Sequence, residues 1–196
     1  MLAAADKARR SKSAMPQVCY TPAMRIIGLA GWSGSGKTTL LTRAIPRIVA
    51  RGVSVSTLKH AHHDLDIDQP GKDSHSHRVA GATEVLIGSQ RRWALMHELR
   101  GEAEPALGAL LQKLSPVDLV VIEGYKRAPH PKLEVHRAAI GQPLLSPADP
   151  TIVAIASDRP LPDAPIPVID LDDIDRIVDT LIRHAVPLDA VLAMTM

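Results

Sequence analysis

The chain has 196 residues, of which 45% are hydrophobic and 22% are charged, and it contains two Trp, two Tyr and no Phe. That length predicts one compact domain, or one domain with tails, built around an aliphatic core. So few rings argue against a single-stranded nucleic-acid platform, which stacks bases on aromatic side chains. The single cysteine, Cys19, excludes an internal disulfide and a cysteine-rich metal site.

The formal net charge of +2 comes from the N-terminal segment. Residues 1–23 have a net charge of +3, which leaves −1 for the remainder. A nearly neutral body gives little reason to expect nucleic-acid binding. No apolar run approaches the roughly 18–20 residues of a membrane span, and the N-terminus lacks the apolar segment of a secretory signal. We therefore expect a cytoplasmic protein with no nucleic-acid or membrane partner.

Three segments follow from the pattern along the chain. Residues 1–23 are expected to form a disordered tail, because basic residues and prolines precede the first apolar run, and Met15 and Met24 are alternative starts. Residues 24–186 are expected to form the single domain. Residues 187–196 are expected to be a loose C-terminal end.

From Met24 to residue 97 the pattern predicts a buried strand, a helix, a second strand and a hairpin or sheet edge. These elements span 25–30, 37–51, 53–58, and 83–88 with 92–97. Pro46 lies inside the helix and predicts a kink. Residues 60–78 are polar and predict no core element.

The second half of the chain continues with a helix, three strands and a final helix. They span 102–114, 118–123, 132–136, 151–156 and 172–184. Strands that alternate with helices are typical of a three-layer α/β sandwich with a mostly parallel sheet. The hairpin would add an antiparallel edge to it.

The strongest motif is the run Gly31-Trp32-Ser33-Gly34-Ser35-Gly36-Lys37-Thr38, which fits G-x-x-x-x-G-K-[ST] completely. It follows a predicted buried strand and opens a predicted helix, which is the context that a phosphate-binding P-loop requires. Its glycines let backbone N–H groups converge on a polyphosphate, and the helix start adds unpaired donors. Lys37 can reach the β- and γ-phosphates, and the Thr38 hydroxyl can bind Mg²⁺. The sequence thus predicts a P-loop NTPase fold with these nucleotide-binding residues: Gly31, Ser33, Gly34, Ser35, Gly36, Lys37, Thr38 and Thr39.

Two carboxylates follow predicted strands. Glu123 ends the strand 118–123, where P-loop proteins need a carboxylate near Mg²⁺ or its waters, so Thr38 and Glu123 are the metal candidates. Asp158 follows the strand 151–156 and could accept the two N–H donors of guanine, which adenine lacks; an ordinary turn residue is the equal alternative. Lys37 and Glu123 are the only candidates for a catalytic role, and no residue is recognisable as a general base.

The segment 59–74 is rich in His and Asp, and three hypotheses compete for it. It could bind Mg²⁺ through Asp64, Asp66 or Asp68. It could bind a transition metal through His60, His62 and His63. It could also be a polar surface loop, and Lys59 and Lys72 suit an anionic ligand better than a metal.

Taken together, these motifs resemble the MobB family of molybdopterin-guanine dinucleotide biosynthesis adapter proteins. The resemblance rests on G-x-S-G-x-G-K-T-T-L at 31–40, K-H-x-H-H-D-x-D-x-D-x-P-G-K-D-S at 59–74, H-R-x-A-G-A at 77–82, E-V-L-I-G-S at 84–89, V-x-x-V-V-I-E-G-Y-K at 117–126 and the Ala-x-Asp that ends at Asp158. The segment 59–82 makes it specific, because the P-loop alone occurs in many families.

The resemblance implies a dimeric, GTP-binding P-loop protein that works beside the MobA-type guanylyltransferase, which joins GMP to molybdopterin. It implies Mg²⁺ and GTP as ligands, molybdopterin as a further candidate ligand, and weak GTP hydrolysis at most. Phosphate and Mg²⁺ contacts carry over to Gly34, Gly36, Lys37 and Thr38, and the Walker B carboxylate to Glu123. Asp64, Asp66 and Asp68 match the family loop without an assigned role.

Two other functions remain open. The P-loop and the Ile-Glu-Gly strand end also resemble uridine-kinase-type enzymes, although no Arg-bearing lid or aromatic acceptor pocket is evident. The histidines suggest a metal-delivery GTPase as a further alternative, although the Cys ligands that are usual in that class are absent. Preference for GTP or ATP, followed by a product assay, separates these classes.

Overall fold

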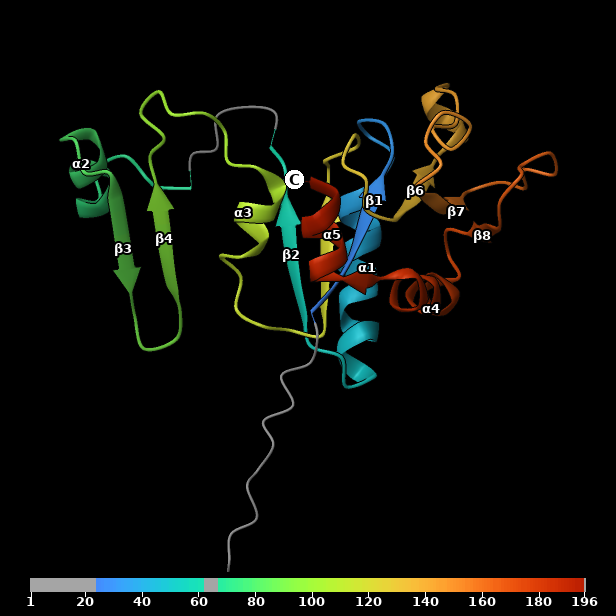
Figure 1. Cartoon of the computed structure of the whole chain (residues 1–196), viewed down its shortest axis with the longest axis horizontal. Coiled ribbons are helices and arrows are strands. Elements are labelled where there is room, and N and C mark those ends of the chain that lie inside the picture. The colour runs from blue at the N-terminus through green and yellow to red at the C-terminus, as the bar shows by residue number, and fades with distance from the viewer. Residues whose placement is uncertain (1–23, 62–66, 196) are drawn as a thin grey trace, which may run out of the picture.

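The computed structural model describes residues 24–61 and 67–195 (Figure 1). Along the chain the elements are β1 (Arg25–Ala30), α1 (Lys37–Ala50), β2 (Val55–Lys59), α2 (Asp73–Val79), β3 (Glu84–Gly88), β4 (Trp93–His97), α3 (Leu107–Leu111), β5 (Leu119–Glu123), β6 (Lys132–His136), the 3₁₀ turn η1 (Ala138–Ile140), β7 (Ile152–Ser157), β8 (Val168–Asp170), α4 (Ile174–His184), β9 (Val186–Pro187) and α5 (Leu188–Thr195).

Six parallel strands form the main sheet in the order β2-β5-β1-β6-β7-β8, and β9 pairs antiparallel with β1. The register places Glu123, the last residue of β5, beside both Leu29 of β1 and Lys59 of β2. The carboxyl ends of these strands therefore meet at one edge of the sheet. Ligands bind at this edge in open α/β sheets.

Helices cover both faces of the sheet. On one face, α1 and α4 pack with Ile27, Leu29 and Val135 into the larger core. On the other face, α3 and α5 pack with Ile26 and Val120 into a smaller core. Successive residues of β1 alternate between these cores, so the strand is apolar throughout. This is the predicted three-layer α/β sandwich, and no helix in the described ranges is long and apolar enough to cross a bilayer.

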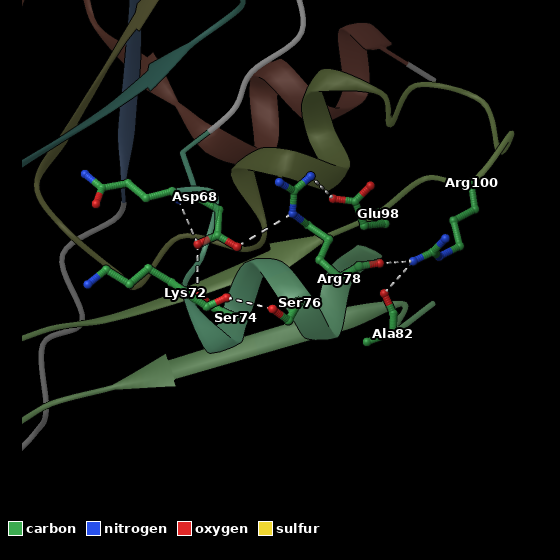
Figure 2. Close-up of polar contacts among 9 residues, drawn as sticks. Asp68, Lys72, Ser74, Ser76, Arg78, Ala82, Glu98 and Arg100 are labelled. Carbon is green, nitrogen blue, oxygen red and sulfur yellow. Dashed lines mark hydrogen bonds and ion pairs between the residues drawn. The ribbon is translucent and has the colours of Figure 1, made fainter. Parts of the chain in front are cut away.

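The hairpin of β3 and β4 forms a separate two-stranded sheet that stands apart from the main sheet with α2 (Figure 1). We call residues 67–100, which contain these three elements, the arm. Ion pairs and hydrogen bonds join its parts (Figure 2). Arg78 of α2 donates to Glu98 at 3.2 Å, and Arg100 donates to the carbonyl oxygens of Arg78 and Ala82. The predicted hairpin is confirmed, although it lies outside the main sheet.

The predicted helix 102–114 is shorter in the structure, and one helix has no predicted counterpart. Residues 102–106 are not helical, and α3 begins only at Leu107, since Pro105 biases the residue before it away from helical angles. The short helix α2 begins within the polar segment 60–78 and ends at Val79, and it has no buried residue. The helix α1 runs from Lys37 to Ala50 through Pro46.

The expectation of a loose C-terminal end is wrong. β9 pairs with Arg25 and Ile26, the part of β1 that β6 does not reach, and α5 then packs on the smaller core. Val191 of α5 has no exposed surface. Ten residues with one proline carry too little periodicity to predict this helix, and the apolar surface that it covers exists only after the sheet has formed.

Candidate functional site

The P-loop connects the buried strand β1 to α1 and has the backbone that its glycines permit. Gly31 has a φ of 146°, and a Cβ at this position would lie 2.6 Å from the carbonyl oxygen of Val135. Gly36 is left-handed, with a φ of 88°, at the N-cap of α1. Only glycine combines this close approach with these angles at low cost. The loop therefore curls tightly around the start of the helix.

A cavity of about 800 Å³ opens over this loop. Its lining comes from the P-loop and from the ends of β2 and β5: Gly31, Trp32, Ser33, Gly34, Gly36, Lys37, Thr38, Thr39, Lys59, His60, Ala61, Glu123, Gly124 and Lys126. We call it the phosphate cavity. Seven of the eight predicted P-loop contact residues line it; the exception is Ser35.

Three lysines face the phosphate cavity. The ammonium group of Lys37 donates to the carbonyl oxygens of Gly31 at 3.1 Å and Trp32 at 2.9 Å. Its pKa is lowered, first by burial and then by the charge of Lys126, with a smaller effect from Lys59; Glu123 opposes the shift. Lys126 also lies 4.9 Å from the centre of the Trp32 ring. Concentrated positive charge beside convergent N–H groups suits a polyphosphate.

Thr38 and Glu123 meet across the floor of the phosphate cavity. The Thr38 hydroxyl donates to Glu123 Oε1 at 2.8 Å, and Lys59 Nζ lies 3.5 Å from the same oxygen. Glu123 is buried, with 9% of its surface exposed. A hydroxyl and a carboxylate are the oxygen ligands that Mg²⁺ takes in nucleotide sites, where phosphates and waters complete its octahedron. These two residues therefore fit a Mg²⁺ ion.

Ser35 and Asp158 lie beside the phosphate cavity and not in its lining. The Ser35 side chain is 2% exposed and lies beneath the loop, against Gly31. Asp158 follows β7 and accepts a hydrogen bond from the backbone N–H of Ala138 at 3.0 Å. Arg137 connects the two, because its Nε donates to the Ser35 carbonyl and its Nη1 lies 4.0 Å from Asp158 Oδ2.

Arg137 is a residue that the sequence reasoning missed. It directly follows the buried strand β6, at the same sheet edge as the P-loop. A basic residue directly after a strand that neighbours β1 is the pattern that would indicate this role. Without the strand order, nothing in the sequence distinguishes Arg137 from the other arginines as a residue of the P-loop site.

The His- and Asp-rich segment divides between two places. Lys59 and His60 line the phosphate cavity, as an anion-binding role would require. Asp68 and Lys72 belong to the arm, where Asp68 accepts from the Ser74 hydroxyl at 2.8 Å and forms an ion pair with Arg78 (Figure 2). In this structure Asp68 pairs within the arm, which stands apart from the main sheet (Figure 1), and a Mg²⁺ role for Asp68 stays a prediction.

The other predicted ligands of this segment lie outside the described residues: His62, His63, Asp64 and Asp66. Within the described ranges, no three His, Cys, Asp or Glu side chains gather as a metal site would need. His60 instead contacts Glu104, with Nε2 2.9 Å from Oε1.

Comparisons with known proteins agree with this geometry. The family model described as molybdopterin guanine dinucleotide synthesis protein B (MobB) matches residues 26–158. Two relatives are named molybdopterin-guanine dinucleotide biosynthesis adapter protein. The one from Escherichia coli is 39% identical and spans 81% of this chain and 91% of its own length; the one from Haemophilus influenzae is 38% identical and spans 79% and 85%.

Solved structures support the same assignment. A crystal structure of molybdopterin-guanine biosynthesis protein B has a TM-score of 0.64 and 26% identity, covering 81% of this chain and 98% of its own. The structure of Bacillus subtilis MobB has the same TM-score at 24% identity, covering 83% and 98%, and so supports the fold. The sequence match, the P-loop context and the shared fold together place this chain in the MobB family.

Proposed function

We propose that this chain is a Mg²⁺- and GTP-binding adapter in molybdopterin guanine dinucleotide biosynthesis, acting in the cytoplasm beside a MobA-type guanylyltransferase. The names of the two relatives supply the pathway. The proposal that the ligand is a nucleotide rests on the phosphate cavity, where a complete P-loop, three lysines and a buried carboxylate converge. No alternative ligand accounts for all of these groups so well as a Mg²⁺-bound nucleoside triphosphate.

The described residues suit binding and charge neutralisation better than fast catalysis. When phosphate enters, the Lys37 ammonium would exchange its two carbonyl partners for phosphate oxygens, at little cost in lost hydrogen bonds. Thr38 and Glu123 would hold Mg²⁺, which supplies further neutralising charge. The one histidine of the cavity lining, His60, contacts Glu104. We therefore infer slow GTP hydrolysis at most.

Guanine selection is assigned to Asp158 as part of this proposal. The strand order puts β5 on one side of β1 and β6 with β7 on the other. A nucleotide whose terminal phosphate lies near Glu123 would extend across the P-loop toward Asp158. Asp158→Asn should therefore reduce the preference for GTP over ATP by about tenfold, because one carboxylate acceptor for a guanine N–H becomes an amide donor.

Trp32 provides a direct assay of the nucleotide site, since its ring lies at the phosphate cavity and donates to the Pro143 carbonyl at 2.8 Å. In a Trp93→Phe background it is the only Trp, so its fluorescence reports GTP and ATP titrations with and without Mg²⁺. We expect Lys37→Ala to weaken GTP binding by about 100-fold, which corresponds to two charge-assisted hydrogen bonds. Glu123→Gln should remove mainly the Mg²⁺-dependent part of the affinity.

Lys113→Ala is the matched control, because this exposed lysine lines neither the P-loop nor the phosphate cavity. A Lys37→Ala protein that binds GTP as tightly as its parent would refute the site. A preference for ATP together with phosphorylation of added nucleosides would replace the adapter by a kinase. Retention of a MobA-type guanylyltransferase on the immobilised chain would support the partner.

We also propose a homodimer that forms through the arm. The hairpin strands pair Leu86 with Leu95 and Gly88 with Trp93, so three large apolar side chains share one face. Their exposed fractions are 68% for Leu86, 46% for Leu95 and 68% for Trp93. An isolated two-stranded hairpin is marginal in water, and an apolar face of this kind is typical of an interaction surface. A second copy of the arm would cover it.

Light scattering after gel filtration tests the dimer. We expect about 42 kDa for the parent, twice the chain mass of 21.1 kDa, and a shift toward one chain mass for Leu86→Glu. Val49→Glu is the control, since Val49 is 56% exposed on α1, away from the arm. A parent that elutes as a monomer at all concentrations would exclude this interface.

A further inference from the structure

A second cavity adjoins the phosphate cavity on its Glu123 side. It has a volume of about 570 Å³ and shares two lining residues, His60 and Lys126, with the phosphate cavity. The segment that follows β5 forms one wall, and the segment that leads into α3 forms the other. We call it the side cavity. A ligand in it would lie next to the terminal phosphate of a bound nucleotide.

One wall of the side cavity is aromatic. The rings of His60 and Tyr125 lie with centroids 4.7 Å apart and planes tilted by 38°. Tyr125 has a φ of 47°, and Gly124 before it has a φ of 100°. A Cβ on Gly124 would lie 2.8 Å from the Cβ of His60, so only glycine allows this approach. Left-handed angles in a non-glycine residue are costly and cluster at ligand sites.

The rest of the lining combines apolar surface with charge. Leu107 and its neighbours at the start of α3 contribute apolar contact. Lys126 and Arg127 contribute two cations, and Glu104 contributes one carboxylate, which contacts His60. Flat apolar surface with an excess of cations suits a flat anion.

We propose that the side cavity binds an anionic pterin next to the bound nucleotide. The rings of His60 and Tyr125 would contact the face of the heterocycle, Glu104 would accept from its amino and ring N–H groups, and Arg127 would pair with its anionic substituent. The choice of a pterin rests on the proposed function, because the molybdopterin in the relatives' names supplies that class.

Pterin-6-carboxylate is a suitable probe, because its own fluorescence reports binding by anisotropy. The full-length Trp93→Phe protein is saturated with Mg²⁺ and a non-hydrolysable GTP analogue, and Trp32 fluorescence follows the nucleotide in the same samples. We expect saturable probe binding that Arg127→Ala and Glu104→Gln each weaken by about tenfold. Nucleotide affinity should stay unchanged in both variants, since neither residue lines the phosphate cavity. Arg92→Ala, at the hairpin turn, is the control that removes an exposed cation elsewhere.

The outcomes separate this inference from the proposed function. Nucleotide binding without probe binding overturns the side cavity as a pterin site and leaves the nucleotide proposal intact. Failure of both refutes the proposed function and the inference with it. Competitive displacement of the probe by GTP means that the cavity holds guanine, which also overturns the inference. Equal affinity for the uncharged 6-hydroxymethylpterin contradicts the role of Arg127.

Discussion

Replacing Gly28 by alanine would put a methyl group where the His130 ring already lies. Gly28 is in the middle of β1, two residues before the strand ends at the P-loop. A Cβ there would lie 2.4 Å from His130 Nε2 and 2.9 Å from Cδ2. Heavy atoms normally pack at about 3.5 Å, so the ring or the strand must move by about 1 Å.

The ring has little room for such a shift. His130 has no exposed surface, and Lys132 beside it is 1% exposed. Overpacking of a dense core costs about 1–3 kcal/mol. We therefore expect Gly28→Ala to lower the free energy of unfolding by about 2 kcal/mol. With a urea m-value of about 2 kcal/mol per M, the unfolding midpoint falls by about 1 M.

Urea titrations at one fixed protein concentration measure this effect. Gly88→Ala is the matched control, because Gly88 also lies in a strand and a Cβ there would meet nothing within 4 Å. In a His130→Ala background most of the Gly28→Ala penalty should disappear, since the colliding ring is gone and only a 3.1 Å approach to Lys132 Cγ is left. The reasoning fails if Gly28→Ala costs no more than Gly88→Ala, or if its penalty is as large without the His130 ring as with it.

Two further stability predictions follow from buried residues. The pKa of His130 is lowered from 6.5 to about 4, first by burial and then by Lys132, with Asp149 opposing. As the pH falls, His130 is protonated in the unfolded chain before it is protonated in the folded one. The contribution of neutral His130 to the free energy of unfolding is therefore complete above pH 6.5 and falls by up to about 3 kcal/mol between pH 6.5 and 4. Urea midpoints measured across this range should fall less in His130→Gln, and an equal fall in both proteins would contradict the assignment. Val191→Ala should lower the free energy of unfolding by about 2 kcal/mol, because Val191 is fully buried in α5, whereas the 52% exposed Met194 of the same helix should tolerate alanine within about 0.5 kcal/mol. Equal effects of the two substitutions would mean that α5 does not pack on the sheet in solution.

The sequence predicts those features of the fold and of the site that depend on residues close together in the chain. A short uninterrupted apolar run between turn signals is typical of a strand buried on both faces, and β1, β5 and β7 begin and end within one residue of their predicted ranges. The P-loop was equally readable, because its glycine angles, its helix start and its lysine all lie within eight residues. Glu123 followed from its place at the end of β5. Each of these features depends on residues that lie close together in the sequence, so the sequence pattern is enough to predict it.

Features that join distant segments needed the tertiary structure. Asp68 resembled a metal ligand in sequence, yet it pairs with Ser74 and Arg78 on the arm. Arg137 gained a role only once β6 was found beside β1, which brings it to the Ser35 carbonyl. The side cavity joins the end of β5 to the start of α3.

The sequence by itself thus determined the P-loop, which predicts a nucleotide phosphate site, and the α/β sandwich fold. Only the tertiary structure decided which charged groups share the phosphate cavity, where α5 packs, and that a second cavity adjoins the first. The physical reason is the order of the parallel strands, which no local pattern specifies and which determines the side chains that meet at the sheet edge.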